Sequence, residues 1–262
     1  MNELVSRVKT LLESKAIDIF IGYENGTRKP RPVFVSKVEE ADKLIFDKNC
    51  TGNIAVYLTR RDMVESKKVG IAASYYALKN ILLLFEENQL KEDNLIVFAL
   101  SETGDIKLLQ SVEEIKKHLK ETPLPAKPDE DEWIRKINAM SLSERWEFWT
   151  EELSRCFKCY ACRSTCPMCY CTKCIVEVNR PQWIQPWAST MSNMEWQINR
   201  VMHMAGRCSD CGSCGDVCPV GIPIHLLTHG MTGWVKDNFG ESTEKGNVLS
   251  TFKPDDKENF IV

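Results

Sequence analysis

The sequence lacks long apolar runs and any marked excess of one charge. Its longest apolar stretches, residues 81–85 and 95–100, are far too short to cross a bilayer, and its first residues do not form a secretory signal. The net charge of −3, from 34 basic and 37 acidic residues, gives no general attraction to nucleic acid or an anionic membrane. We therefore expect a cytoplasmic protein with no membrane span and no nucleic-acid partner.

Cysteine is almost absent from the first half of the chain and concentrated in the second. Of the 12 cysteines, Cys50 alone precedes Cys156, and the other eleven lie between Cys156 and Cys218. In a reducing compartment, clustered cysteines are metal ligands or redox groups rather than disulfides. This division predicts two domains, residues 1–120 and 133–235. A proline-rich acidic linker at 121–132 joins them, and a polar tail follows at 236–262.

The first domain is predicted to be a small α/β structure. Apolar periodicity indicates a helix over residues 4–12, strands at 17–21, 32–35, 68–73 and 95–100, and helices at 75–90 and 112–119. Strand, helix and strand over 68–100 predict a parallel crossover. Ser36 and Glu39 form a capping-box pattern, which predicts a further helix towards Phe46.

Nucleotide-binding motifs are missing from this domain. None of the 13 glycines has another glycine two residues away, and no Gly-Lys-Ser/Thr sequence occurs. No Ser-His-Asp or His-Glu-x-x-His arrangement of catalytic or metal-binding residues is found either. We therefore expect a docking or scaffold domain, and the glycine content argues against a bound flavin.

The second domain is predicted to be mostly helical. Ser141 with Glu144 and Ser192 with Glu195 form capping-box patterns that predict two helices. An aromatic stripe on the first of these helices is expected to pack in the core against metal sites. The stripe consists of Trp146, Phe148, Trp149 and Leu153.

Two cysteine runs share the same spacing, with gaps of two, two and three residues followed by proline. They are Cys156, Cys159, Cys162, Cys166 with Pro167, and Cys208, Cys211, Cys214, Cys218 with Pro219. Bacterial ferredoxins have this spacing, and the fourth cysteine of each run ligates the other cluster. We therefore expect two [4Fe-4S] clusters with crossed ligand sets. The first set is Cys156, Cys159, Cys162 and Cys218, and the second is Cys208, Cys211, Cys214 and Cys166. Zinc is the alternative, but it gives no reason for the third gap or the prolines.

Four cysteines remain outside these runs. They are Cys50, Cys169, Cys171 and Cys174. Three thiols within six residues and one remote thiol would complete a set of four for a third [4Fe-4S] cluster or for zinc. We hypothesise that Cys50 is the remote ligand and ties the first domain to the second. The alternative is that Cys50 is an ordinary buried cysteine.

Arginines flank the cysteine runs at Arg163, Arg200 and Arg207. A positive charge close to a cluster raises its reduction potential. The alternative is that each arginine is a salt-bridge partner.

Two family resemblances follow from these motifs. The paired runs, with Cys211-Gly-Ser-Cys214 and Cys218-Pro-Val-Gly-Ile-Pro-Ile, resemble the helical ferredoxin domains of heterodisulfide reductase C-type subunits and succinate dehydrogenase iron-sulfur subunits. Ile21-Gly-Tyr-Glu-Asn-Gly and Arg31-Pro-Val-Phe-Val resemble the start of the β-subunit family of coenzyme F420 hydrogenases and formate dehydrogenases. In that family a larger domain binds flavin.

These resemblances imply an electron-transfer subunit of a multi-component anaerobic oxidoreductase. It would relay electrons between a flavoprotein or hydrogenase-type partner and a partner that resembles heterodisulfide reductase or is linked to ferredoxin. The chain would then have no substrate site of its own. The alternative is a flavin- or F420-dependent oxidoreductase β subunit that has one.

Overall fold

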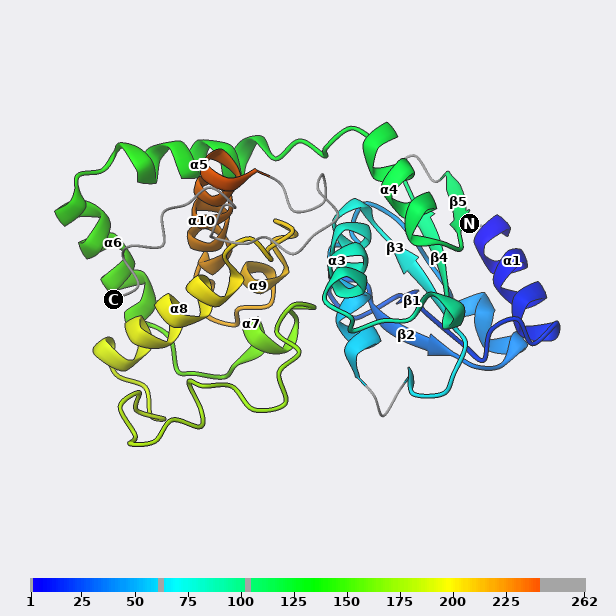
Figure 1. Cartoon of the computed structure of the whole chain (residues 1–262), viewed down its shortest axis with the longest axis horizontal. Helices are drawn as coiled ribbons and strands as arrows, with labels where there is room; N and C mark the ends of the chain where they lie inside the picture. Colours follow the sequence, from blue (N-terminus) through cyan, green and yellow to red (C-terminus); the bar gives the residue numbers. More distant parts are fainter. Residues whose placement is uncertain (1, 61–63, 102–104, 241–262) are drawn as a thin grey trace, which may run out of the picture.

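The computed structural model describes residues 2–60, 64–101 and 105–240 of the chain. Figure 1 shows two lobes side by side, with the N-terminal strands in one lobe and only helices and loops in the other. We call residues 2–121 the α/β lobe and residues 128–240 the helical lobe. This arrangement confirms the predicted fold class of an α/β part followed by a mostly helical part.

A mixed five-stranded sheet forms the centre of the α/β lobe. The strands are β1 (Ile19–Glu24), β2 (Arg31–Val35), β3 (Val69–Ala73), β4 (Leu95–Leu100) and β5 (Ile106–Leu109). Their order is β2-β1-β3-β4-β5, with parallel pairing at the centre and antiparallel pairing at both edges. Every residue of β3 is buried, as expected for a strand covered on both faces. The sequence did not predict β5.

Helices of the α/β lobe are α1 (Asn2–Glu13), α3 (Tyr75–Glu86) and α4 (Val112–Glu121), with short 3-10 helices η2 (Ile54–Thr59) and η3 (Glu92–Asn94). The parallel pair β3 and β4 is joined through α3, so the predicted crossover is confirmed. The helix α3 ends earlier than predicted, because Asn88 has a left-handed backbone with φ of 55°.

The prediction of a helix from Ser36 towards Phe46 is wrong. The segment instead forms a short 3-10 helix, η1 (Val38–Lys43), whose N-cap is Lys37 and has no side-chain cap. Two residues beyond it, Ile45 donates its N–H to the carbonyl of Tyr23 at 2.8 Å and forms a bridge beside β1. An extended bridge at that point leaves no room for a longer helix.

The helical lobe contains α5 (Pro128–Ala139), α6 (Leu142–Ser154), α7 (Ala161–Ser164), α8 (Thr190–Met204), α9 (Ser213–Asp216) and α10 (Ile224–Phe239). The capping box at the start of α6 is confirmed, since Ser141 and Glu144 bond each other's backbone N–H groups at 2.8 and 3.3 Å. The helix α8 begins earlier than predicted, because Ser189 and not Ser192 is its N-cap.

The segment expected as a linker is partly helical. The helix α4 ends at Glu121 and α5 begins at Pro128. Proline lacks a backbone N–H, but the N–H groups of the first helical turn have no partner within the helix, so no hydrogen bond is lost there. Of the expected tail, residues 236–239 belong to α10, and residues 241–262 lie outside the described part of the chain. Within the described ranges, no helix is long and apolar enough to cross a membrane.

The aromatic stripe of α6 is only partly buried. Trp149 and Leu153 lie in the core of the helical lobe together with half-buried cysteines of both runs, as predicted. Trp146, however, is 56% exposed, which corrects the expectation for that residue. A separate apolar cluster joins the lobes, where Leu83 and Leu84 of α3 pack against the second half of the chain.

Candidate metal centres

The two cysteine runs fold into matching loops. In each loop the third cysteine lies in a one-turn helix, Cys162 in α7 and Cys214 in α9. The residues on either side of the second cysteine have a left-handed backbone, with φ between 57° and 77°. They are Lys158 and Tyr160 in the first loop, and Asp210 and Gly212 in the second. Such turns direct backbone N–H groups towards the concave side of a loop, where an anion can bind.

Backbone amides of these loops donate to the cysteine sulfurs. The N–H of Lys158 donates to Sγ of Cys156 at 3.4 Å, and the N–H of Asp210 donates to Sγ of Cys208 at the same distance. The two loops thus repeat one contact at equivalent positions. Hydrogen bonds of this kind favour the charged thiolate that a metal requires.

Each run places its last cysteine in the cavity of the other run. The first cavity, of about 390 Å³ including its open mouth, contains Cys156, Cys159, Cys162 and Cys218 in its wall. The second cavity, of about 370 Å³ by the same measure, contains Cys166, Cys208, Cys211 and Cys214. The four thiols of each expected crossed set therefore surround a single hollow.

The helix α8 runs past both cavities. Trp196 and Gln197 line the first cavity, whereas Arg200 and Met204 line the second. Residues four apart lie on one face of a helix, so the same face of α8 forms part of the wall of both cavities. The one-turn helices α7 and α9 also pack against each other, and the two cavities are therefore neighbours.

The α/β lobe covers the second cavity. Asn80 of α3 lies in the cavity wall, and its Oδ1 accepts hydrogen bonds from Nδ2 of Asn53 and Oγ of Ser209, both at 2.7 Å. The backbone N–H of Asn53 donates to Oγ of Ser213 at 3.0 Å. These buried contacts hold the second cysteine loop against the first half of the chain.

An ion pair lies beside the same interface. The guanidinium of Arg207 donates to both carboxylate oxygens of Glu87 at 2.6 and 2.7 Å. The hydroxyl of Tyr170 donates to the same carboxylate at 2.6 Å. Paired hydrogen bonds between arginine and a carboxylate fix orientation, so this contact orients the two lobes.

The surroundings of the two cavities fit metal clusters. Burial raises the pKa of Cys156, and it raises that of Cys214 to about 12; a bound metal would favour the thiolate of each. Arg200 is only 4% exposed, and its Nε and Nη1 atoms have no hydrogen-bond partner among the described residues. A buried cation of this kind requires a neighbouring anion, which a cluster with thiolate ligands would supply.

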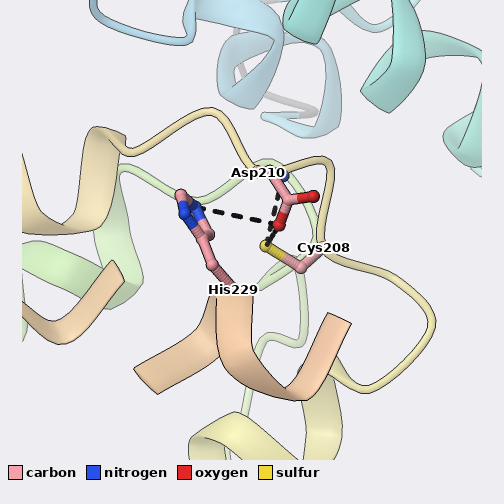
Figure 2. A group of neighbouring side chains, drawn as sticks. All are labelled: Cys208, Asp210 and His229. Carbon is pink, nitrogen blue, oxygen red and sulfur yellow. Dashed lines mark hydrogen bonds and ion pairs between the residues drawn. The ribbon is translucent and has the colours of Figure 1, made fainter. Parts of the chain in front are cut away.

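His229, which no sequence motif singled out, lies in the wall of the second cavity. Figure 2 shows His229 of α10 reaching towards Asp210 and Cys208 of the second loop. His229 Nε2 is 3.8 Å from Oδ1 of Asp210, and that oxygen is 3.7 Å from Sγ of Cys208. On its other side, Nδ1 of His229 lies 3.0 Å from Glu130. Cys208 belongs to the second expected set and His229 lines the second cavity, so Asp210 and His229 lie around that candidate site and do not form a separate one.

The other four cysteines lie in different surroundings. Cys50 is buried in the core of the α/β lobe, where burial raises its pKa to about 11. Cys169 lies beside Cys166 in the apolar cluster between the lobes, and Cys174 packs near Val176. Cys171 is exposed. The third metal site therefore stays a prediction.

Comparison with known proteins identifies part of the helical lobe. Residues 152–222, which include all eight cysteines of the two runs, match the family model described as a 4Fe-4S dicluster domain. The helical lobe thus contains a 4Fe-4S dicluster domain. Such a domain with this cysteine-rich region implies two [4Fe-4S] clusters.

Two curated relatives are distantly similar to the chain. It is 33% identical over 110 residues to the F420-dependent formate dehydrogenase subunit beta of Methanocaldococcus jannaschii. This alignment covers 40% of this chain and 28% of that protein. It is 35% identical over 83 residues to the F420-dependent formate dehydrogenase 1 subunit beta of Methanococcus maripaludis. This second alignment covers 32% of this chain and 21% of that protein. The matched segments thus span a quarter or so of these relatives.

Proposed function

We propose that this chain is an electron-transfer subunit of a multi-subunit anaerobic oxidoreductase. The observation that carries this proposal is the pair of neighbouring cavities, each with a crossed set of four cysteines in its wall. Cys156, Cys159, Cys162 and Cys218 would hold one [4Fe-4S] cluster, and Cys208, Cys211, Cys214 and Cys166 would hold the other. Bound clusters supply one-electron redox chemistry, and two in neighbouring cavities form a path for electrons.

The exposed end of this path is the first cavity. Cys159 is exposed there, and Phe157, in the same cavity wall, is 55% exposed. The second cavity has Asn80 of the α/β lobe in its wall. We assign the first cluster to exchange with a partner protein, and the α/β lobe (proposed domain 1–120) to docking.

Exposed tryptophans in the second half of the chain support a partner surface. Each is at least 48% exposed. They are Trp133, Trp146, Trp183, Trp187 and Trp234. Exposed large apolar side chains are typical of protein interfaces, where aromatic residues are enriched.

The partners are a flavoprotein or hydrogenase-type subunit on one side and a heterodisulfide-reductase-like or ferredoxin-linked protein on the other. The similarity to two formate dehydrogenase beta subunits supports a place in such a complex. Both relatives are named F420-dependent, which favours the second candidate function, a flavin- or F420-dependent beta subunit with its own substrate site.

Anaerobic purification of the full chain tests the proposal. We expect about eight irons and eight sulfides per chain, and two interacting cluster signals in the electron paramagnetic resonance (EPR) spectrum after reduction with dithionite. A colourless protein that holds zinc would contradict it. A flavin absorbance that persists after the clusters are bleached would instead support the second candidate function.

The same metal analysis tests the third site. A third site would add about four irons or about one zinc to the protein. If Cys174→Ser loses this extra metal and Cys50→Ala keeps it, the site belongs to the 169–174 segment without Cys50. Loss in both variants would support Cys50 as the remote ligand. About eight irons and no zinc would refute a third site.

A further inference from the structure

Of Arg163, Arg200 and Arg207, two are neutralised by carboxylates. Arg163 Nη1 lies 2.5 Å from Glu177, and Arg207 forms its paired contact with Glu87. Their role as salt-bridge partners accounts for both. In the described part of the chain no carboxylate contacts Arg200.

Arg200 lies between the two cysteine sets. It lines the second cavity, while its Nη2 donates at 3.1 Å to the backbone carbonyl of Cys162, a member of the first set. Cys166 and Cys214 of the second set lie in the wall of the same cavity. One guanidinium is thus close to cysteines of both sets.

A buried charge without a partner is strongly unfavourable, so the folded protein must offset it. The amide of Gln197 and the thioether of Met204, one turn away on the same helix face, carry no net charge. Clusters with four thiolate ligands are anionic, and they are the groups in this region that would offset Arg200. Each one-electron reduction adds a further negative charge to a cluster, and in a medium of low dielectric a fixed cation favours that reduced state.

We propose that Arg200 is the shared counter-charge of the two clusters and raises both of their reduction potentials. The proposal rests on the proposed function, because it requires a cluster in each cavity. Arg200 acts as a positioning residue of the electron path, since it touches the surroundings of both clusters and ligates neither.

The test is a dithionite titration of the anaerobic full chain, monitored by EPR, in wild type, Arg200→Gln, Arg200→Lys and the double variant Arg163→Gln/Glu177→Gln. In Arg200→Gln both midpoint potentials become more negative. At a fixed ambient potential, the ratio of reduced to oxidised cluster falls about tenfold, which corresponds to about 59 mV for a one-electron couple. Arg200→Lys keeps the charge and shows a smaller shift. The double variant removes a neutral pair and leaves both potentials as in wild type.

Unchanged potentials in a fully loaded Arg200→Gln protein, or a shift in one cluster alone, would overturn the assignment. If Arg200→Gln fails to hold both clusters, Arg200→Lys decides. Two clusters at potentials close to wild type would support the role of the charge. Loss of clusters in Arg200→Lys as well would show that the hydrogen bond to Cys162 matters instead. A wild-type protein without two clusters refutes the proposed function itself, whereas these outcomes concern Arg200 alone.

Discussion

Asn193 shows how a single side chain shapes the entrance to the first cysteine loop. It is 1% exposed, and its Nδ2 donates to the carbonyls of Leu153 and Cys156 at 3.1 and 2.7 Å. Those carbonyls belong to the end of α6 and to the first cysteine of the first run. One amide on α8 therefore fixes the backbone where the chain leaves α6 and enters the first cysteine loop.

Replacement of Asn193 by alanine should weaken the first site selectively. Two buried carbonyls lose their donor, which should lower the free energy of unfolding by about 2 kcal/mol. Alkylation of the anaerobic protein, followed by mass spectrometry, should find Cys156 labelled before Cys208. The control is Asn199→Ala, since within the described ranges Nδ2 of Asn199 bonds to its own helix alone, at the carbonyl of Glu195 at 2.8 Å. Equal labelling of both loops in Asn193→Ala would refute the selective role.

At the scale of elements, the one-turn helices α7 and α9 hold the third cysteine of each run but pack against different neighbours. The second helix packs closely against α10, because Gly215 lies against the ring of His225. A Cβ atom at position 215 would lie 1.9 Å from Nδ1 of His225. Glycine at this position is therefore required by packing, not by backbone conformation.

Gly215→Ala should destabilise the packing of α9 on α10. Overpacking of this kind costs about 1–3 kcal/mol, and a thermal unfolding scan of the anaerobic protein should show a lower Tm. The double variant Gly215→Ala/His225→Ala should recover part of the loss, because the ring that clashes is removed. Gly230→Ala on α10 is the matched control, since a Cβ there meets no atom within 4 Å and should leave the Tm unchanged or slightly raised. A Tm of Gly215→Ala equal to wild type would contradict the close packing.

At the scale of the whole molecule, the α/β lobe contributes to the wall of the second cavity, the candidate site of the second cluster. Asn80 brings an amide from the first half of the chain into a cavity whose cysteines all come from the second half. The pair of Glu87 and Arg207 lies on the same side of the molecule as a further contact between the lobes. Loading of the second site and docking of the lobes should therefore depend on each other.

Asn80→Ala should expose the second site and spare the first, the opposite of Asn193→Ala. Ser209 and Asn53 lose their common acceptor, so the interface should weaken by about 2 kcal/mol. In the alkylation experiment Cys208 should then react before Cys156. The exposed Asn94 offers a control: in Asn94→Ala the alkylation of Cys208 and Cys156 should follow the same order as in wild type. If Asn80→Ala protects Cys208 as well as wild type does, the α/β lobe does not seal this site.

The motifs that the sequence predicted correctly depend on contacts between residues close together in the chain. The capping box of Ser141 and Glu144 closes within one helical turn, and the crossover from β3 to β4 follows from periodicity within each segment. The spacing of the two cysteine runs predicted two cluster sites and the part of the chain that carries them, because a short loop can bring three thiols together without help from the rest of the fold.

The tertiary structure decided which of several chemically similar residues does which task. Arg163, Arg200 and Arg207 are equivalent in sequence terms, yet only packing shows that, among the described residues, a carboxylate pairs with Arg163 and with Arg207 but not with Arg200. His229, Asn80 and the exposure of Trp146 were likewise hidden, because each depends on elements distant in the chain. Local spacing therefore predicted two clusters, whereas long-range packing determined the charge and the solvent exposure around each candidate site.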